Sequence, residues 1–380
     1  MNSSPLASIE THFRCLTDPR AEHSIKHCLI DIVMITICAV ICGADNWVEI
    51  ENYGLAKIEW LQQFLELPHG IPSHDTLMRV FARLKPEQLQ QCFLNWIQEV
   101  SQITKGQVIA IDGKSLRSTL ERGQNRGAIH MVSAWATENR LVLGQKKVQT
   151  KSNEITAIPE LLKILAIEDC LVSIDAMGCQ KEIAQTIIEQ QGDYILALKA
   201  NHKNLYEDVV QLFESARQQD WKEIEHEFHQ TINKGHGRIE IRRHWIMGKT
   251  EYLCGAEQWK GLQSIGLVES ERRVNNQITL EHRYYLLSIQ NDAQRFAEAV
   301  RSHWGIENRL HWVLDVSFQE DLIKGCEGNS AENLAVVRHL AVNLLTHENT
   351  AQAGIHAKRL KAGWDNNYLA LVLNSLSNST

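Results

Sequence analysis

The order of extended and helical segments after residue 106 limits this chain to few architectures. Three extended apolar runs come first, and a helix, a strand, a helix and a strand follow them, over 107–112, 128–136, 141–148, 154–165, 170–175, 180–191 and 193–199. Three strands followed by alternating helices and strands predict a mixed sheet with helices on both faces.

This order resembles that of the ribonuclease H-like core. A helix over 203–218 follows, and then the chain returns to strands over 224–232, 238–248, 263–274 and 278–289. Helical periodicity resumes over 293–316 and 331–345. The fold class that we expect is α/β, a ribonuclease H-like catalytic core with an all-β insertion, preceded by a helical N-terminal domain.

A length of 380 residues corresponds to roughly two to three domains and excludes a single small binding module. We expect five segments along the chain. These are a helical N-terminal domain (1–104), the first part of the core (105–219), the β insertion (220–290), the part of the core with the catalytic helix (291–347) and a C-terminal helical tail (348–380).

The N-terminal region contains a helix-turn-helix outline. A helix over 56–67, a turn at 68–72 and a second helix that begins at the N-cap Ser73 make up this outline. Leu77, Val80, Phe81 and Leu84 form the apolar face of the second helix, while Arg79 and Arg83 share another face that could meet phosphate. A helical hairpin with solvated arginines explains the same pattern equally well.

Two apolar strands end in aspartate, at Asp112 and at Asp175. If these strands are neighbours, both carboxylates emerge at the same edge of the sheet and can share divalent cations. Carboxylate oxygens suit Mg²⁺ or Mn²⁺, and two such ions about 3.5–4 Å apart can stabilise the attacking and leaving oxygens of a phosphoryl transfer. Each aspartate alone could simply cap the segment that follows it.

A third acid stands on a predicted helix. At helical spacing His303, Glu307 and His311 share one face. Two other interpretations remain open for this stripe. It could bind zinc, although its spacing matches no metalloprotease motif such as HExxH, or its histidines could simply belong to the core and its rim.

The net charge of −7, from 39 Lys and Arg against 46 Asp and Glu, excludes a polycationic chain. By itself it weakly favours an enzyme that acts on small molecules. Positive charge is concentrated locally, because residues 229–249 contain five Lys or Arg against one acid. In an extended strand Arg238 and Arg242 lie on one side with Glu240 between them, which predicts either a ridge that follows a nucleic-acid backbone or a solvated strand face.

The cysteines and the first residues of the chain indicate the cellular compartment. Nine scattered cysteines without a CxxC pair argue against a disulfide framework or a zinc ribbon and for reduced thiols. The first residues lack the pattern of a signal peptide, and the apolar run 29–44 is shorter than the roughly 20 residues that span a bilayer. We therefore expect a cytoplasmic protein with no membrane partner.

Several ordered motifs resemble those of DDE transposases. They are Asp112-Gly-Lys-Ser-Leu-Arg117, 151–159, 175–180, 234–240, 303–316 and Glu320-Asp321, and the most similar group is the ISAs type of insertion-sequence transposases, which includes the H-repeat-associated proteins of Rhs elements. Residues 43–45 and 70–76 resemble the transposase-associated domain that precedes the core in that group. The similarity covers roughly residues 15–375.

The resemblance implies a bacterial enzyme that cleaves DNA at the ends of an insertion sequence and joins the freed 3′-hydroxyl to target DNA. Asp112, Asp175 and Glu307 become the catalytic and metal-binding triad, with two Mg²⁺ ions for which Mn²⁺ can substitute. The expected partners are double-stranded DNA, as terminal inverted repeats and target, and a second copy of the chain in a synaptic dimer. The enzyme would associate with the nucleoid when it acts.

The predicted DNA contacts are basic or amide side chains near the triad or in the basic clusters. They are Lys114, Arg117, Lys199, Arg238, Arg242, Arg243, Arg301, His303, Asn308, Arg309, Arg79 and Arg83. One departure from the wider superfamily concerns the signature Tyr-x2-Arg-x3-Glu-x6-Lys, whose positions around Glu307 are here Val300, His303 and Leu314. Whether a hairpin intermediate forms at the DNA end is therefore left open.

Two alternative functions remain. One is a ribonuclease H-like, metal-dependent nuclease without strand transfer, and the other is an inactive, transposase-derived DNA-binding protein. The acidic total also predicts weak affinity for random DNA and dependence on metal and on the terminal sequence.

Overall fold

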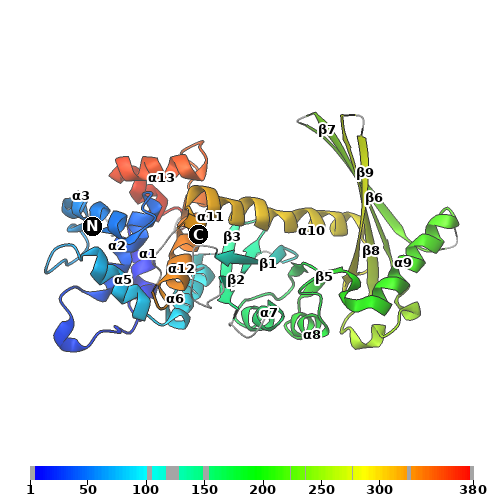
Figure 1. Ribbon diagram of the computed structural model, residues 1–380, viewed down its shortest axis with the longest axis horizontal. Coiled ribbons are helices and arrows are strands. Elements are labelled where there is room, and N and C mark those ends of the chain that lie inside the picture. Colours follow the sequence, from blue (N-terminus) through cyan, green and yellow to red (C-terminus); the bar gives the residue numbers. More distant parts are fainter. Residues whose placement is uncertain are drawn as a thin grey trace.

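The structure is a computed structural model that describes residues 5–100, 105–116, 128–148, 154–222, 224–235, 237–275, 277–322 and 327–376. A mixed sheet runs through it in the order β3-β2-β1-β4-β5-β9-β8-β7-β6 (Figure 1). Its strands are β1 (Val108–Leu116), β2 (Ile129–Ala136), β3 (Leu141–Lys147), β4 (Leu171–Ile174), β5 (Asp193–Leu198), β6 (Glu227–Gly235), β7 (Arg238–Met247), β8 (Ser264–Val274) and β9 (Gln277–Leu287).

The first five strands form the part of the sheet that positions the acids. β2 is antiparallel to both β1 and β3, whereas β1, β4 and β5 are parallel to one another. The parallel strands are joined through helices, as such connections require. The prediction of a mixed α/β sheet with a helical region before it is confirmed.

Helices cover both faces of this sheet. α7 (Glu154–Leu162) and α8 (Lys181–Glu189) lie on one face, and the long helix α10 (Ala293–Ile306) crosses the other (Figure 1). Phe296 of α10 packs directly on Gly266 of β8, where an added Cβ would lie 2.5 Å from the ring. This glycine therefore lets α10 approach the sheet closely.

The predicted β insertion continues the core sheet, because β9 pairs antiparallel with β5 over Tyr284–Leu287 and Ile195–Leu198. Helix α9 (Lys203–Gln218) packs on β9, with the rings of Phe213 and Tyr284 6.0 Å apart. Three short 3₁₀ turns lie near these strands, η3 (Ala200–His202), η4 (Thr250–Tyr252) and η5 (Ala256–Gln258). The far ends of β6–β9 extend beyond the helices (Figure 1).

The helices from the two ends of the chain lie together in one helical body (Figure 1). They are α1 (Ala7–Phe13), η1 (Glu22–Ser24), α2 (Leu29–Ile41), α3 (Trp47–Ala56), α4 (Ile58–Leu61), α5 (His74–Arg83), α6 (Pro86–Val100), α12 (Ser330–His347), α13 (Ile355–Trp364) and α14 (Asn366–Leu373). Arg359 of α13 donates to the Val40 carbonyl at 2.9 Å and pairs with Asp45 at 2.7 Å. The predicted division into five domain segments stays a prediction.

The predicted limits of the first helix in the helix-turn-helix outline, 56–67, are wrong. The structure has α3 ending at Ala56 and only the short α4, which ends at Leu61, within 56–67; Leu67, further along, adopts a left-handed φ of 41°. Ser73 precedes α5 but makes no side-chain cap bond. The predicted apolar face of α5 is buried, so that part is confirmed.

Two further elements differ from the prediction. β1 does not end at Asp112 but continues to Leu116, because the residues after the aspartate still pair with β2. The predicted continuous helix 293–316 consists of α10, a π-helical turn η6 (Glu307–His311) and α11 (Trp312–Ser317), and the short turn η7 (Glu320–Leu322) follows. The interruption falls on the acid proposed as the third member of the triad.

Candidate active site

Asp112 and Asp175 lie at the same edge of the sheet. The parallel pairing of β1 with β4 ends at Ile111 and Ile174, and each aspartate is the next residue. The Asp175 carboxylate accepts hydrogen bonds from the backbone N–H groups of Met177 and Gly178 at 3.0 and 3.2 Å. These bonds hold Asp175 in place, and the register brings the two acids to neighbouring strand positions as predicted.

Glu307 reaches this edge from the helix that crosses the sheet. It is the first residue of η6, is exposed to solvent, and lines a cavity together with Asp175. A π turn has more residues per turn than an α-helix and is frequent at functional sites. The spacing i, i+4, i+8 therefore does not describe which of His303, Glu307 and His311 share a face.

Burial dominates the electrostatics of Asp112. Burial raises the pKa of its carboxyl to about 7, and the negative charges of Asp175, Glu307 and Glu154 add to the rise, while the Gly113 N–H opposes it. Carboxylates that repel one another in this way favour a divalent cation between them. The donor chemistry therefore fits Mg²⁺, although no three His, Cys, Asp or Glu side chains of the described ranges are gathered closely enough to hold an ion.

A cavity of about 450 Å³ opens at the ends of β4 and β5, where β9 continues past β5. Asp175, Glu307 and Lys199 line it, and so does Trp304, whose ring lies 4.8 Å from the guanidinium carbon of Arg283. An exposed cation, a half-exposed indole and two acids thus share one opening.

Two histidines of the predicted stripe face inward. His303 lies 3.0 Å from the Ser173 hydroxyl through Nδ1, and burial lowers the pKa of its ring. His311 lies 3.5 Å from Asp112 through Nδ1, and burial together with Lys114 lowers its pKa to about 4, so the ring is neutral at pH 7. His303 thus supports β4 and also lines the cavity of Asp175 and Glu307, and its role as a DNA contact stays a prediction.

Lys114, another predicted DNA contact, is largely buried and ion-paired. Its ammonium lies 2.7 Å from Asp315 of α11 and 2.5 Å from Glu320 of η7, and only 10% of its side chain is exposed. Glu320 is 2% exposed and has Arg338 of α12 3.4 Å away on its other side. Lys114 therefore joins the strand of Asp112 to the segment that follows Glu307.

The arginines of the basic strand β7 are paired within the sheet. Arg238 and Arg242 both contact Glu240, which lies on their side of the strand, at 3.1 and 2.5 Å. Arg243 bridges Glu269 and Glu271 of β8 at 2.8 and 2.9 Å. The expected ridge of free positive charge on β7 is thus largely neutralised, because strand pairing places acids opposite or beside its arginines.

Other predicted DNA contacts remain at the surface. Arg79 and Arg83 of α5, Lys199 after β5, and Arg301, Asn308 and Arg309 around η6 are exposed, whereas Arg117 lies outside the described residues. The Asn308 amide donates to the Trp304 carbonyl at 3.0 Å. The pKa of Arg309 is lowered by burial and by two neighbouring cations, Arg140 and Arg301.

Arg140 was missed by the sequence analysis. It is exposed in the turn between β2 and β3, with a φ of 52°, and no local pattern relates it to residues 301–309. Within the described ranges no salt bridge joins Arg140, Arg301 or Arg309 to an acid. These three arginines, the arginine cluster, form unneutralised positive charge near Glu307.

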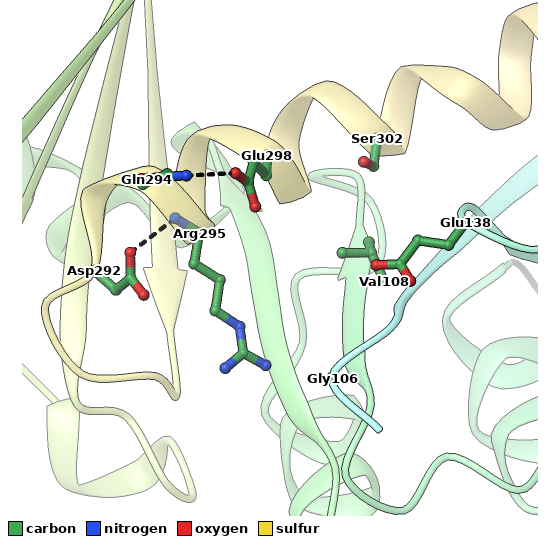
Figure 2. A pocket seen from close by; sticks show the side chains of 8 residues that line it. All are labelled: Gly106, Val108, Glu138, Asp292, Gln294, Arg295, Glu298 and Ser302. Atoms are coloured by element: carbon green, nitrogen blue, oxygen red, sulfur yellow. Dashed lines mark hydrogen bonds between the residues drawn. The ribbon is translucent and has the colours of Figure 1, made fainter. Parts of the chain in front are cut away.

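A second cavity lies at the other end of β1. It has a volume of about 600 Å³ between Gly106, Val108 and Glu138 on one side and one face of α10, from Asp292 to Ser302, on the other. Figure 2 shows Arg295 directed toward the segment at Gly106, with Gln294 bonded to Glu298 along the helix at 2.9 Å. Val108 precedes Asp112 by about 13 Å along an extended strand, so this cavity does not contain the acids.

A family model described as "Transposase DDE domain" matches residues 103–344, which include all three acids. The chain is a member of the DDE transposase family. A second model, described as "DDE_Tnp_1-associated", matches residues 10–97, the helical region before the core of this transposase.

Full-length relatives agree with this assignment. The transposase is 40% identical over 373 residues to the "H repeat-associated putative transposase YhhI" of Escherichia coli strain K12, covering 97% of this chain and 98% of YhhI. It is also 40% identical over 376 residues to the "Putative transposase YncI" of Escherichia coli O157:H7, covering 98% of this chain and 96% of YncI.

Among solved structures, one titled "Cryo-EM structure of piggyBac transposase synaptic complex with hairpin DNA (SNHP)" aligns with a TM-score of 0.42 and 12% identity, over 98% of this chain and 77% of that chain. In the described part of the transposase, no helix is both long and apolar enough to cross a membrane.

Proposed function

We propose that this transposase cleaves DNA at the ends of its insertion sequence in a Mg²⁺-dependent reaction and transfers the freed 3′ end to target DNA. The observation that supports the proposal is that Asp112 and Asp175 follow neighbouring strand ends while Glu307 shares a cavity with Asp175, near enough for both charges to act on Asp112. The strand order β3-β2-β1-β4-β5 supports a ribonuclease H-like core for residues 105–219.

Asp112, Asp175 and Glu307 would hold two Mg²⁺ ions, with Mn²⁺ as a substitute. When bound, such ions stabilise the attacking and leaving oxygens of an in-line displacement at phosphorus. The protein's own part is to keep the acids in position. Backbone N–H groups fix Asp175, and the neutral ring of His311 lies against Asp112 without adding a positive charge that would compete with a cation.

The DNA contacts that we propose are exposed cations at the helix that carries Glu307, together with Lys199, which lines the cavity. The arginine cluster of Arg140, Arg301 and Arg309, together with Lys199, has no acid opposite it among the described residues and can meet phosphates. Arg79 and Arg83 of α5 would contact an element end from the helical body. Two protomers would act together on two DNA ends in a synaptic dimer, in the bacterial cytoplasm.

Cleavage of the element's terminal inverted repeats tests the proposal. Purified protein with Mg²⁺ should cut at the repeat end and form a covalent joint between donor 3′ end and target, and the variants Asp112→Asn, Asp175→Asn and Glu307→Gln should each abolish both products. Products of hydrolysis without a joint would favour a nuclease, and binding without any cleavage would favour an inactive DNA-binding protein.

A matched pair of arginine variants tests the DNA surface. Arg309→Ala should weaken binding to the repeat, and the slope of log K against log salt concentration should fall by the amount expected for about one phosphate contact. Arg243→Ala should leave affinity and slope unchanged, because Arg243 is bound to Glu269 and Glu271. Equal effects of the two substitutions would contradict the proposed surface.

A further inference from the structure

Glu154 lies against the residue that follows Asp112. It is the first residue of α7 and is 8% exposed. A Cβ added to Gly113 would lie 2.1 Å from its Oε1 atom, so the carboxylate occupies the space that any side chain at position 113 would need. Gly113 does not adopt a left-handed backbone conformation. Glycine is therefore required here by the lack of room for a side chain.

Two side chains hold this carboxylate in place. His130 of β2 bonds to Glu154 through Nε2, and its Nδ1 lies 2.8 Å from the Ser115 hydroxyl of β1. Ser115 and His130 face each other in the β1–β2 pairing. The chain Ser115–His130–Glu154 thus connects the start of α7 to the strand segment directly after Asp112.

The position of Glu154 adds a fourth acid beside the three that the family pattern supplies. Its carboxylate lies against Gly113, the residue next to Asp112, and its side chain is only 10% exposed. The His130 ring pairs with this carboxylate on one side, and a divalent cation at Asp112 would add positive charge on the other side, where the remaining acids lie. Groups next to metal ligands commonly set the affinity of the site in this way.

We propose that Glu154 is a fourth acidic residue of the active site, a positioning residue that His130 and Gly113 hold beside Asp112 and that raises the affinity of the site for divalent cations. This inference rests on the proposed function, because it assumes a cation at Asp112. The segment 151–159 carries part of the family resemblance, but nothing in its sequence relates position 154 to position 112.

Manganese binding to the full-length protein, followed by the loss of the free Mn²⁺ signal in electron paramagnetic resonance, tests the inference. Glu154→Gln keeps the size of the side chain and removes its charge, and it should weaken Mn²⁺ binding by about tenfold or more. The control Glu332→Gln removes the charge of another largely buried glutamate, which pairs with Lys147 at 3.3 Å, and should change the affinity less than twofold. In cleavage assays, the Mg²⁺ concentration for half-maximal rate should rise for Glu154→Gln, and higher Mg²⁺ should restore part of the rate.

Gly113→Ala provides a second variant if Glu154→Gln does not fold. The added methyl group would lie 2.1 Å from the Glu154 Oε1 atom and 2.6 Å from the His130 Nε2 atom, so it disturbs this pair without changing any charge, and Mn²⁺ binding should weaken in the same direction. Wild-type Mn²⁺ affinity and wild-type Mg²⁺ dependence in Glu154→Gln would overturn the inference alone. Absence of Mn²⁺ binding by the wild-type protein would instead overturn the proposed function and the inference with it.

Discussion

Replacement of Lys114 distinguishes a buried structural cation from a DNA contact. Lys114→Met keeps the aliphatic stem and removes the ammonium that lies 2.5 Å from Glu320 and 2.7 Å from Asp315. Breaking a buried ion pair by removing one partner costs about 3–5 kcal/mol, because the remaining charge is left uncompensated. Arg338 stays 3.4 Å from Glu320, so we expect the lower limit, about 3 kcal/mol of unfolding free energy.

Urea denaturation followed by tryptophan fluorescence measures this loss. The control Lys199→Met removes an exposed lysine and should change the unfolding free energy by less than about 0.5 kcal/mol. The double variant Lys114→Met with Glu320→Leu removes the orphaned charge and should recover part of the loss, which makes the two substitutions non-additive. A stable Lys114→Met protein whose only defect is weaker DNA binding would refute the reasoning and restore Lys114 as a DNA contact.

Three further predictions concern stability. Because burial and neighbouring acids raise the Asp112 pKa from 3.8 to about 7, the native state binds its proton more tightly than the unfolded state, and stability falls as the pH rises from about 4 to 7. Asp112→Asn should therefore stabilise the metal-free protein in urea denaturation at pH 8, by at least about 1 kcal/mol, while it abolishes cleavage. Burial lowers the His244 pKa from 6.5 to about 4, so stability falls as the pH drops from 6.5 to 4, and His244→Phe should make that fall less steep in thermal denaturation at several pH values. Gly266→Ala should lower stability by about 1–3 kcal/mol and reduce cleavage, because the methyl group pushes Phe296 and the helix that leads to Glu307 away from the sheet.

Each of these has an outcome that contradicts it. Equal stability of Asp112→Asn and wild type across pH 5–8 would mean that Asp112 is not perturbed by its neighbours. An unchanged pH profile of His244→Phe would assign the acid sensitivity to other groups. Normal stability of Gly266→Ala would show that α10 does not depend on close contact at β8.

The three acids could be found in the sequence because the evidence for each is local. An aspartate after an apolar run marks where the parallel pairing of β1 and β4 ends, although β1 itself continues to Leu116, and the order of strands and helices makes these two strands neighbours in the sheet. Helical periodicity and the family pattern predicted Glu307 as the third acid. They did not predict the π turn that begins at this residue. The strands and helices of the core were likewise predictable, because burial on one face imposes a regular spacing on the residues.

The roles of Lys114, Arg243 and Glu154 were decided only by the tertiary structure. Lys114 meets a carboxylate 206 positions later, and Arg243 is paired because β8 lies beside it. Glu154 matters because α7 begins beside β1, where a glycine leaves room for its carboxylate. The sequence by itself determined the strand and helix periods and the family; which charges are neutralised and which remain free for DNA depends on contacts between distant residues, and no local spacing encodes these.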